Sequence, residues 1–343
     1  MRLCVVGFGL IGGSVAAAHK AQDPKARVVA VDLRGSLESE AARALADVRV
    51  AIDDDERFDH ELASADLVVL AAPVRSVATM LDRVLARAKV VTDCGSTKRE
   101  IVERAEGSPQ RARFVPGHPL AGGSDAGAGA ARADLFVDRA WVLCDAPGDA
   151  AALAVVRGFV AGLGAVPVLM SAAEHDRALA LTSHAPQVVA SALVVLSERG
   201  ACQVAEGPGF ASTTRIAGGN PAVWGDILGT DADEIARALR EIGAELARVA
   251  DALERSQPEA ALELIRDPDE DVRRAAIEIL NQTKDERAIG YLIEATRDKD
   301  WWVRERAVDA LAEIGSPRAL PTLLDLLRAN DARSLPTVTR AIG

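Results

Sequence analysis

The sequence predicts an α/β domain with a parallel sheet, then an all-α domain, then a short α-solenoid tail. From Met1 to about Pro147, short runs of β-branched residues alternate with Ala-rich stretches, which is typical of βαβ units. From about Asp149 to Arg255 the pattern is helical, and from Pro258 onward a unit of about 30 residues repeats.

Composition favours a cytoplasmic globular protein. The 343 residues, 49% apolar and 27% charged, suggest two or three domains. The net charge of −11 argues against binding to nucleic acid or to an anionic membrane. Four scattered cysteines suggest reduced thiols, and no uninterrupted apolar run reaches the roughly 18 residues that span a membrane. The apolar start imitates a signal peptide, but its glycines have another explanation below.

The strands of the first domain are predicted from continuous apolar runs, as expected for a sheet that is covered on both faces. These runs are Leu3–Val6, Val28–Val31, Leu67–Ala71, Val90–Thr92 and Trp141–Cys144.

The second zone contains helix signals and one loop signal. Ser171 and Glu174 form a capping box that opens a long helix, and Pro186 should kink or break it. Another helix is expected from Ala232 to Glu254. The Gly-, Ser- and Thr-rich segment Gly207–Pro221 is predicted to be a loop.

The third zone is an internal repeat. DPDEDVRRAAIEIL and DKDWWVRERAVDAL match at a spacing of 31, as do Leu292 and Leu323. Two helical halves per unit resemble HEAT-like repeats. Trp301 and Trp302 lie at a turn where an exposed aromatic would suit a protein partner, although we expect at least one of them to pack internally. The predicted domains are therefore 1–148, 149–256 and 257–343.

A dinucleotide site is predicted at the start of the chain. GFGLIG, with Gly7, Gly9 and Gly12, follows the first apolar run and opens a helical stretch. Asp32, 20 residues beyond Gly12, would accept hydrogen bonds from a ribose and disfavour a 2′-phosphate, so NAD is expected over NADP. Arg34 weakens that preference slightly. The further candidates for cofactor binding are Leu10, Ile11, Ala72 and Pro73.

Chemical residues are expected at two places. DCGSTK follows the strand Val90–Thr92 and supplies the hydroxyls of Ser96 and Thr97 at a carboxyl end, where ligands bind in such sheets. His118 lies between Gly117 and Pro119 in a stiff turn. We assign no metal site, and His19, His60 and His175 look peripheral.

These motifs resemble one family. In order, GFGLIGGS, DCGSTK, GHPLAGG, ARADLF, EHDRALALTSHAPQVVASAL and GFASTTRIA are similar to the prephenate/arogenate dehydrogenases of tyrosine biosynthesis, over roughly Met1 to Arg255. The resemblance implies an NAD-binding Rossmann domain, a helical domain that forms a homodimer, and an active site between them. Many relatives end in an ACT domain, which is not apparent here.

The resemblance also implies the chemistry, in which NAD⁺ takes hydride from the carbinol carbon of prephenate while CO₂ leaves. His118 matches the catalytic histidine that accepts the hydroxyl proton, and Ser96 the serine that hydrogen-bonds the hydroxyl. Arg215 matches the arginine that binds a substrate carboxylate, and His184 the histidine of the S-H-x-P motif. Thr97 and Gln187 complete the expected substrate site.

Two departures leave the substrate open. Many relatives that use prephenate have S-H-L-P-H, where this chain has Gln187 at the last position, and some have a basic residue where it has Ala211. Fewer positive groups would tolerate an ammonium, so arogenate or 4-amino-4-deoxyprephenate is the alternative substrate.

Two other hypotheses are disfavoured by the sequence. A β-hydroxyacid dehydrogenase would need a lysine in the helical domain, but Asp149 to Arg255 contains none. A scaffold with a degenerate enzyme domain is disfavoured, because the glycine motif, Asp32, His118 and Arg215 are intact.

Overall fold

The computed structural model describes residues 1–123, 127–144, 149–200, 206–254, 264–283 and 286–329. The chain forms two compact units, Met1–Arg240 and Glu241–Gly343.

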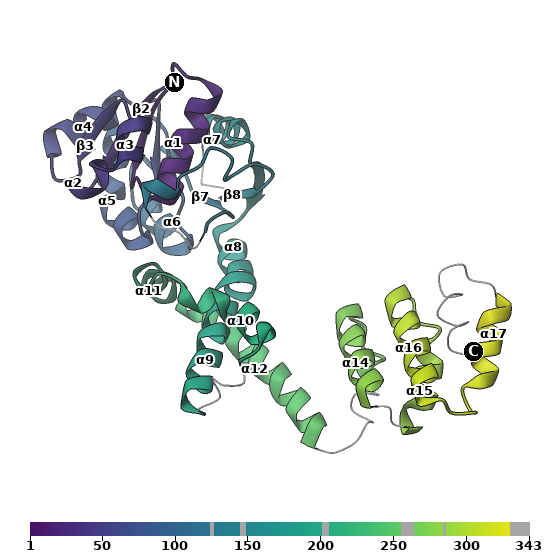
Figure 1. The fold of residues 1–343 in the computed structure, drawn as a ribbon. Helices are drawn as coiled ribbons and strands as arrows, with labels where there is room; N and C mark the ends of the chain where they lie inside the picture. Colours follow the sequence, from purple (N-terminus) through teal and green to yellow (C-terminus); the bar gives the residue numbers. More distant parts are fainter. Residues whose placement is uncertain (124–126, 145–148, 201–205, 255–263, 284–285, 330–343) are drawn as a thin grey trace. The chain divides into compact units, whose positions relative to one another are not determined.

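A six-stranded parallel sheet is the centre of the first unit (Figure 1). Its strand order is β3-β2-β1-β4-β5-β6, the order of a Rossmann domain. Parallel pairing holds throughout the sheet, and Val6 of β1 pairs with Val31 on one side and Leu70 on the other. The predicted α/β class is thereby confirmed. The strands are β1 (Arg2–Val6), β2 (Arg27–Asp32), β3 (Val48–Ala51), β4 (Leu67–Leu70), β5 (Val91–Asp93) and β6 (Phe114–Val115).

Helices cover both faces of this sheet because successive strand residues point to opposite sides. Leu3 and Val5 pack toward α1, α3 and α7, whereas Cys4 and Val6 pack toward α4, α5 and α6. Both apolar layers are fully buried, which explains the continuous apolar runs. The helices are α1 (Leu10–Gln22), α2 (Arg34–Leu37), α3 (Glu40–Leu45), α4 (Asp55–Ser64), α5 (Val74–Arg87), α6 (Arg99–Glu106) and α7 (Ala150–Gly162), with short 3-10 turns at Arg111–Arg113 and Ala128–Ala130.

A second, three-stranded sheet contains β7 (Gly117–Pro119), β8 (Ala140–Cys144) and β9 (Val166–Met170). β8 is antiparallel to β7 and parallel to β9, so the run Trp141–Cys144 is a strand but belongs to a separate sheet. The predicted runs do not include β3, β6, β7 and β9, and His118 lies in the strand β7 and not in a turn. All four are at the edges of their sheets, and β3 and β9 have partly exposed residues, so they do not need continuous apolar runs.

The rest of the first unit is helical. Its elements are α8 (Ala172–Leu179), a π-helical turn (Ala180–His184), α9 (Ala185–Arg199), α10 (Pro208–Thr214), a 3-10 turn (Arg215–Gly218), α11 (Pro221–Thr230) and α12 (Ala232–Glu254), which crosses into the second unit. The capping box of Ser171 and Glu174 is present at the start of α8, as predicted.

Pro186 is expected to kink or break the long helix near Ser183–Ala185, and a π-helical turn at Ala180–His184 interrupts the α-helical pattern there. Pro186 itself lies in the first turn of α9, where a missing N–H costs least. One prediction for this region needs correction. The segment Gly207–Pro221 is mostly helical, not a loop. Pro208 begins α10, and the hydroxyls of Thr213 and Thr214 donate to carbonyls one turn earlier, so these polar side chains are compatible with the helix.

The stretch Ala172–Arg199 has the length and apolar composition of a membrane-spanning helix, in the described part of the chain. A single such stretch is weak evidence, since core helices of soluble proteins pass the same test. It also contains the buried polar side chains His184 and Gln187.

The second unit consists of paired helices around one apolar core (Figure 1). Its described helices are α14 (Glu270–Thr283), α15 (Ile289–Ala295), α16 (Trp301–Ile314) and α17 (Leu320–Ala329), with a 3-10 turn at Glu286–Ala288. Leu292 and Leu323, which match at the repeat spacing, are both buried in this core. Trp302 packs against the core, whereas Trp301 is 46% exposed.

The turn that opens each repeat is held by the same contacts. In the first repeat, Arg273 Nη1 donates to the carbonyl oxygens of Asp267 and Pro268, 2.8 and 3.1 Å away. In the second, Arg304 makes the equivalent bonds to Asp298 and Lys299. The repeats are also joined, because the Arg273 guanidinium binds the Asp298 carboxylate of the next turn.

Replacing Arg273 by Leu should destabilise the repeats. The side chain of Arg273 is 4% exposed. Its loss removes the ion-pair partner of the Asp298 carboxylate and the hydrogen-bond donor of two backbone carbonyls. We expect a loss of about 3 kcal/mol in the opening free energy of α14 and α16, measured by amide hydrogen exchange. Arg328→Gln removes an exposed ion pair in the same unit and should leave that exchange unchanged. Equal effects of the two variants would contradict this account.

Candidate active site

The turn between β1 and α1 is shaped by its glycines. Gly7 has φ of +91°, and a Cβ there would lie 2.5 Å from the Ala71 carbonyl oxygen. A Cβ on Gly12 would lie 1.9 Å from the Gly7 carbonyl oxygen, whereas one on Gly9 would meet no atom within 4 Å. Gly7 and Gly12 are therefore required by the fold. The open side of Gly9, at the N-terminus of α1, is free for a phosphate to approach.

Asp32 lies at the end of β2, beside this turn. Its carboxylate accepts the backbone N–H groups of Phe8 and Leu33, both at 2.6 Å, so it is held at the carboxyl edge of the sheet. Arg34 forms an exposed ion pair with Asp53, 3.1 Å away. Asp32 and Arg34 therefore lie where a nucleotide ribose would bind.

A cavity of about 190 Å³ lies at the same edge of the sheet. It brings together four residues that the sequence analysis assigned to the site: Ile11, Ala72, Pro73 and Ser96. Its other lining residues are Ala71, Val74, Cys94 and Gly95 from the sheet side, and Val223, Asp226 and Ile227 from α11. An open glycine turn, a carboxylate and a largely apolar cavity fit a dinucleotide.

A fully buried ion pair fixes the backbone next to His118. Lys98 Nζ contacts the Asp93 carboxylate, and the side chains of both are 0% exposed. Asp93 Oδ1 accepts the Gly117 N–H at 2.9 Å, and Lys98 Nζ donates to the Gly117 carbonyl oxygen at 2.8 Å. A Cβ on Gly117 would lie 2.8 Å from the Asp93 carbonyl oxygen. The pair therefore holds both polar groups of the residue that precedes His118, and only glycine fits there.

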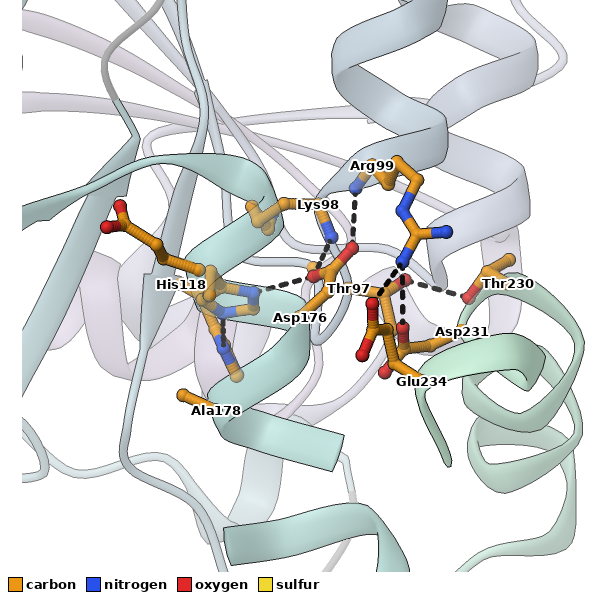
Figure 2. Close-up of polar contacts among 12 residues, drawn as sticks. Thr97, Lys98, Arg99, His118, Asp176, Ala178, Thr230, Asp231 and Glu234 are labelled. Carbon is orange, nitrogen blue, oxygen red and sulfur yellow. Dashed lines mark hydrogen bonds and ion pairs between the residues drawn. The ribbon is translucent and has the colours of Figure 1, made fainter. Parts of the chain in front are cut away.

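His118 is the first member of a hydrogen-bonded chain (Figure 2). Its Nδ1 lies 2.8 Å from Nε2 of His175, and Nδ1 of His175 lies 2.7 Å from the Asp176 carboxylate. Asp176 also accepts the N–H groups of Lys98 and Arg99, both at 2.8 Å. Burial disfavours ionisation of Asp176, but the bonds from His175 and the two amides lower its pKa, so the carboxylate is charged.

This chain determines the tautomer of His118. A charged Asp176 requires the proton of His175 on Nδ1, which leaves Nε2 of His175 as an acceptor. His118 must then donate from Nδ1, so its own Nε2 carries a free lone pair. Burial, His175 and Lys98 hold the pKa of His118 well below its usual value, so the ring is neutral near pH 7.

His175 looks peripheral in the sequence, but in the structure it is a member of this chain. His175 is 0% exposed and directly contacts His118. The signal in the sequence is the adjacent Asp176, in a helix opened by a capping box, but spacing alone does not reveal which histidine this helix faces.

His184 belongs to a second imidazole–carboxylate pair. It lies in the π-helical turn, 1% exposed, with Nδ1 3.1 Å from the Asp231 carboxylate and its ring edge against Trp224. Gln187, one turn further along, is 7% exposed. Thr97 is fully buried, and its hydroxyl lies 2.7 Å from that of Thr230.

Arg215 lies apart from these packed residues. It is exposed at the start of a 3-10 turn, and within the described ranges no hydrogen bond or ion pair engages its guanidinium. His19 packs against Phe159, and His60 is exposed on α4. Groups of three or more His, Cys, Asp or Glu able to hold a metal ion are absent from the residues that the structure describes.

Comparison with known proteins gives three family matches. Residues 15–169 match the nucleotide-binding domain of prephenate dehydrogenase, residues 171–267 match its dimerization domain, and residues 258–342 match HEAT repeats.

Individual relatives agree with these matches. The prephenate dehydrogenase of Bacillus subtilis is 33% identical over 68% of this chain and 65% of its own length. The cyclohexadienyl dehydrogenase of Zymomonas mobilis is 32% identical over 73% of this chain and 88% of its own length. The crystal structure of prephenate dehydrogenase from A. aeolicus, in complex with hydroxyphenyl propionate and NAD⁺, has a similar fold, with a TM-score of 0.68 at 24% identity over 84% of this chain and 97% of that one.

Two glycine substitutions should separate folding from dinucleotide binding. Gly9→Ala places a methyl group in open space and should preserve stability while weakening NAD⁺ binding at least tenfold, because the methyl group blocks the pyrophosphate. Gly12→Ala should instead cost about 3 kcal/mol of stability, because its Cβ collides with backbone. Calorimetric titration with NAD⁺ and urea unfolding measure the two effects, and the opposite assignment would contradict the geometry.

Breaking the buried ion pair should be costly in either direction. Asp93→Asn or Lys98→Met leaves one uncompensated buried charge, for which we expect a loss of about 3–5 kcal/mol in urea unfolding. The double variant should lose clearly less than the sum, since no lone charge remains. Lys89→Met breaks an exposed pair with Asp66 and serves as the control. Additive losses from the two single variants would disprove the coupling.

Proposed function

Because this chain belongs to the prephenate dehydrogenase family, we propose that it converts prephenate to 4-hydroxyphenylpyruvate by NAD⁺-dependent oxidative decarboxylation. The observation that carries this proposal is the neutral imidazole of His118, whose Nε2 lone pair is kept available by the chain to His175 and Asp176. An alcohol oxidation needs such a base.

Bound NAD⁺ would supply the hydride acceptor, with its phosphates at Gly7, Gly9, Leu10 and Gly12, its ribose at Asp32 beside Arg34, and its reactive ring near Ile11, Ala72 and Pro73. The carboxylate of Asp32 disfavours a 2′-phosphate, so NAD is expected over NADP.

The protein residues then manage the proton and the substrate charges. His118 Nε2 accepts the hydroxyl proton while the carbinol carbon gives up hydride. The ring carboxylate leaves as CO₂, and its electron pair makes the ring aromatic. His118 returns the proton to the phenolate oxygen, so no net proton is released. Asp176 stabilises the transient imidazolium through His175.

In this proposal Ser96 hydrogen-bonds the substrate hydroxyl, because it lines the cavity on the loop that follows β5. Arg215, with an unengaged guanidinium, binds a carboxylate. His184 and Gln187 line the side of the substrate site that belongs to the helical domain. Thr97 stabilises the packing of that side through its hydrogen bond to Thr230.

Arogenate is the alternative substrate, and 4-amino-4-deoxyprephenate belongs to the same alternative. Gln187 is buried and uncharged where many relatives have histidine, and Ala211 adds no positive charge. Such a site suits a substrate ammonium better than a cationic one does. The Zymomonas relative, a cyclohexadienyl dehydrogenase, is compatible with either substrate.

We also propose that the protein is a cytoplasmic homodimer that does not bind membranes. The family match to a dimerization domain and the exposed apolar residues Leu181, Val195 and Leu196 support self-association through the helical domain. A protein partner at the HEAT-like repeats stays a prediction, to which the exposed Trp301 is relevant.

Steady-state assays with each pair of substrate and cofactor test the function. Purified protein should form NADH from NAD⁺ and prephenate or arogenate, with NADP⁺ much poorer. Absence of turnover with both substrates, in protein that binds NAD⁺, would overturn the proposal.

His118→Asn should remove the base without removing the site. We expect kcat to fall about 10²–10⁴-fold, while substrate binding measured by calorimetry changes little. A loss confined to KM would contradict the role of proton acceptor. His60→Asn, on an exposed helix surface, is the matched control and should retain full activity.

A further inference from the structure

A buried carboxylate that the proposed mechanism does not use lies behind His184. Asp231, between α11 and α12, has a side chain that is 0% exposed. Its Oδ2 pairs with His184 Nδ1 at 3.1 Å, and its Oδ1 has no hydrogen-bond partner among the described residues. A buried carboxylate with a single hydrogen bond is costly to keep ionised, so a nearby positive charge is needed.

Arg99 provides that charge (Figure 2). One terminal nitrogen of its guanidinium lies 3.8 Å from Asp231 Oδ1 and 3.6 Å from Glu234 Oε1. The backbone N–H of Arg99 is held by Asp176, so the side chain begins from a fixed point. Arg99 therefore lies among three carboxylates, one of which also supports His118.

We infer that Arg99 and Asp231 are positioning residues that fix the ring of His184 in the substrate site. An ionised Asp231 accepts the Nδ1–H of His184 and thereby orients its Nε2 edge. When Asp231 gains a proton, His184 loses this acceptor and its ring can reorient. The place of His184 in the substrate site rests on the proposed function, but the control of its ring by Asp231 and Arg99 does not.

The surrounding charges support this role for Arg99. Burial and the nearby Asp176 raise the pKa of Asp231, while His184 and Arg99 oppose that rise. Removing Arg99 takes away a positive charge that stabilises the ionised carboxylate of Asp231. Asp231 should therefore accept a proton at higher pH. Among the described residues, four titratable or charged groups face His184 and Asp231. They are His118 from β7, Asp176 from α8, Arg99 from α6 and Glu234 from α12.

The chain offers a matched control for Arg99. Arg177 also lies near Glu234, with its Nε 3.9 Å from Oε2, but within the described ranges it forms no ion pair with Asp231. Arg99→Gln and Arg177→Gln remove the same charge from the same neighbourhood, and Arg99→Lys retains the charge. None of these changes removes the backbone N–H that Asp176 accepts.

The direct test is the protonation of Asp231, followed through the ¹⁵N signals of the His184 ring in the enzyme without substrate. The chain has five histidines, so ¹⁵N-histidine labelling with His184→Gln for assignment identifies the His184 signals. We expect Asp231 to gain its proton at a pH about 0.5–1 unit higher in Arg99→Gln than in wild type and Arg177→Gln, with Arg99→Lys close to wild type. Identical titrations of wild type and Arg99→Gln would overturn the inference.

Steady-state kinetics of the variants provide a second test of the inference. Arg99→Gln should raise the substrate KM about fivefold below neutral pH. Its kcat should stay within about twofold of wild type, because His118 keeps its hydrogen bond to His175 and, through it, to Asp176. Asp231→Asn should raise KM without that pH dependence. A loss of kcat alone would count against the positioning role. A wild-type enzyme that fails to turn over either substrate would refute the proposed function. The protonation of Asp231, followed through the His184 ring, would still decide the inference.

Discussion

The protein depends on one buried pair of charges. Asp93 ends a central strand and Lys98 begins the segment that leads into α6, and together they bind both polar groups of Gly117. The nucleotide-binding sheet and the base of the reaction are thereby fixed to the same two side chains. The geometry of His118 is set by the sheet and not by the flexibility of a surface loop, which is how a neutral base can be held ready without reorganisation.

The same short segment also reaches the helical domain. The amides of Lys98 and Arg99 donate to Asp176, and the Arg99 side chain approaches Asp231. Each of the two imidazoles is thus backed by a carboxylate, and each carboxylate is connected to residues 97–99.

The sequence supported the main architecture because its strongest patterns have direct physical causes. Continuous apolar runs mark strands that are buried on both faces, and the spacing from Gly12 to Asp32 follows from one βαβ unit. The strands β3 and β9 could not be predicted because they are edge strands with partly exposed residues. Helix α10 could not be predicted because its Gly, Ser and Thr residues favour loops, and only in the structure do threonine hydroxyls donate to the helix backbone. His175 and Asp231 could not be placed because their partners, His118 and His184, are 57 and 47 residues away. The first pair is created by packing between the first two predicted domains, and the second by packing between distant helices of the helical domain.

The repeat turns have a consequence for how this tail could change over evolutionary time. Arg273 satisfies its own turn and also binds the Asp298 carboxylate of the following one. This first unit is therefore completed by its C-terminal neighbour. Duplication or loss of material is tolerated only in whole multiples of the period, because any other length would leave a guanidinium facing the wrong side chain.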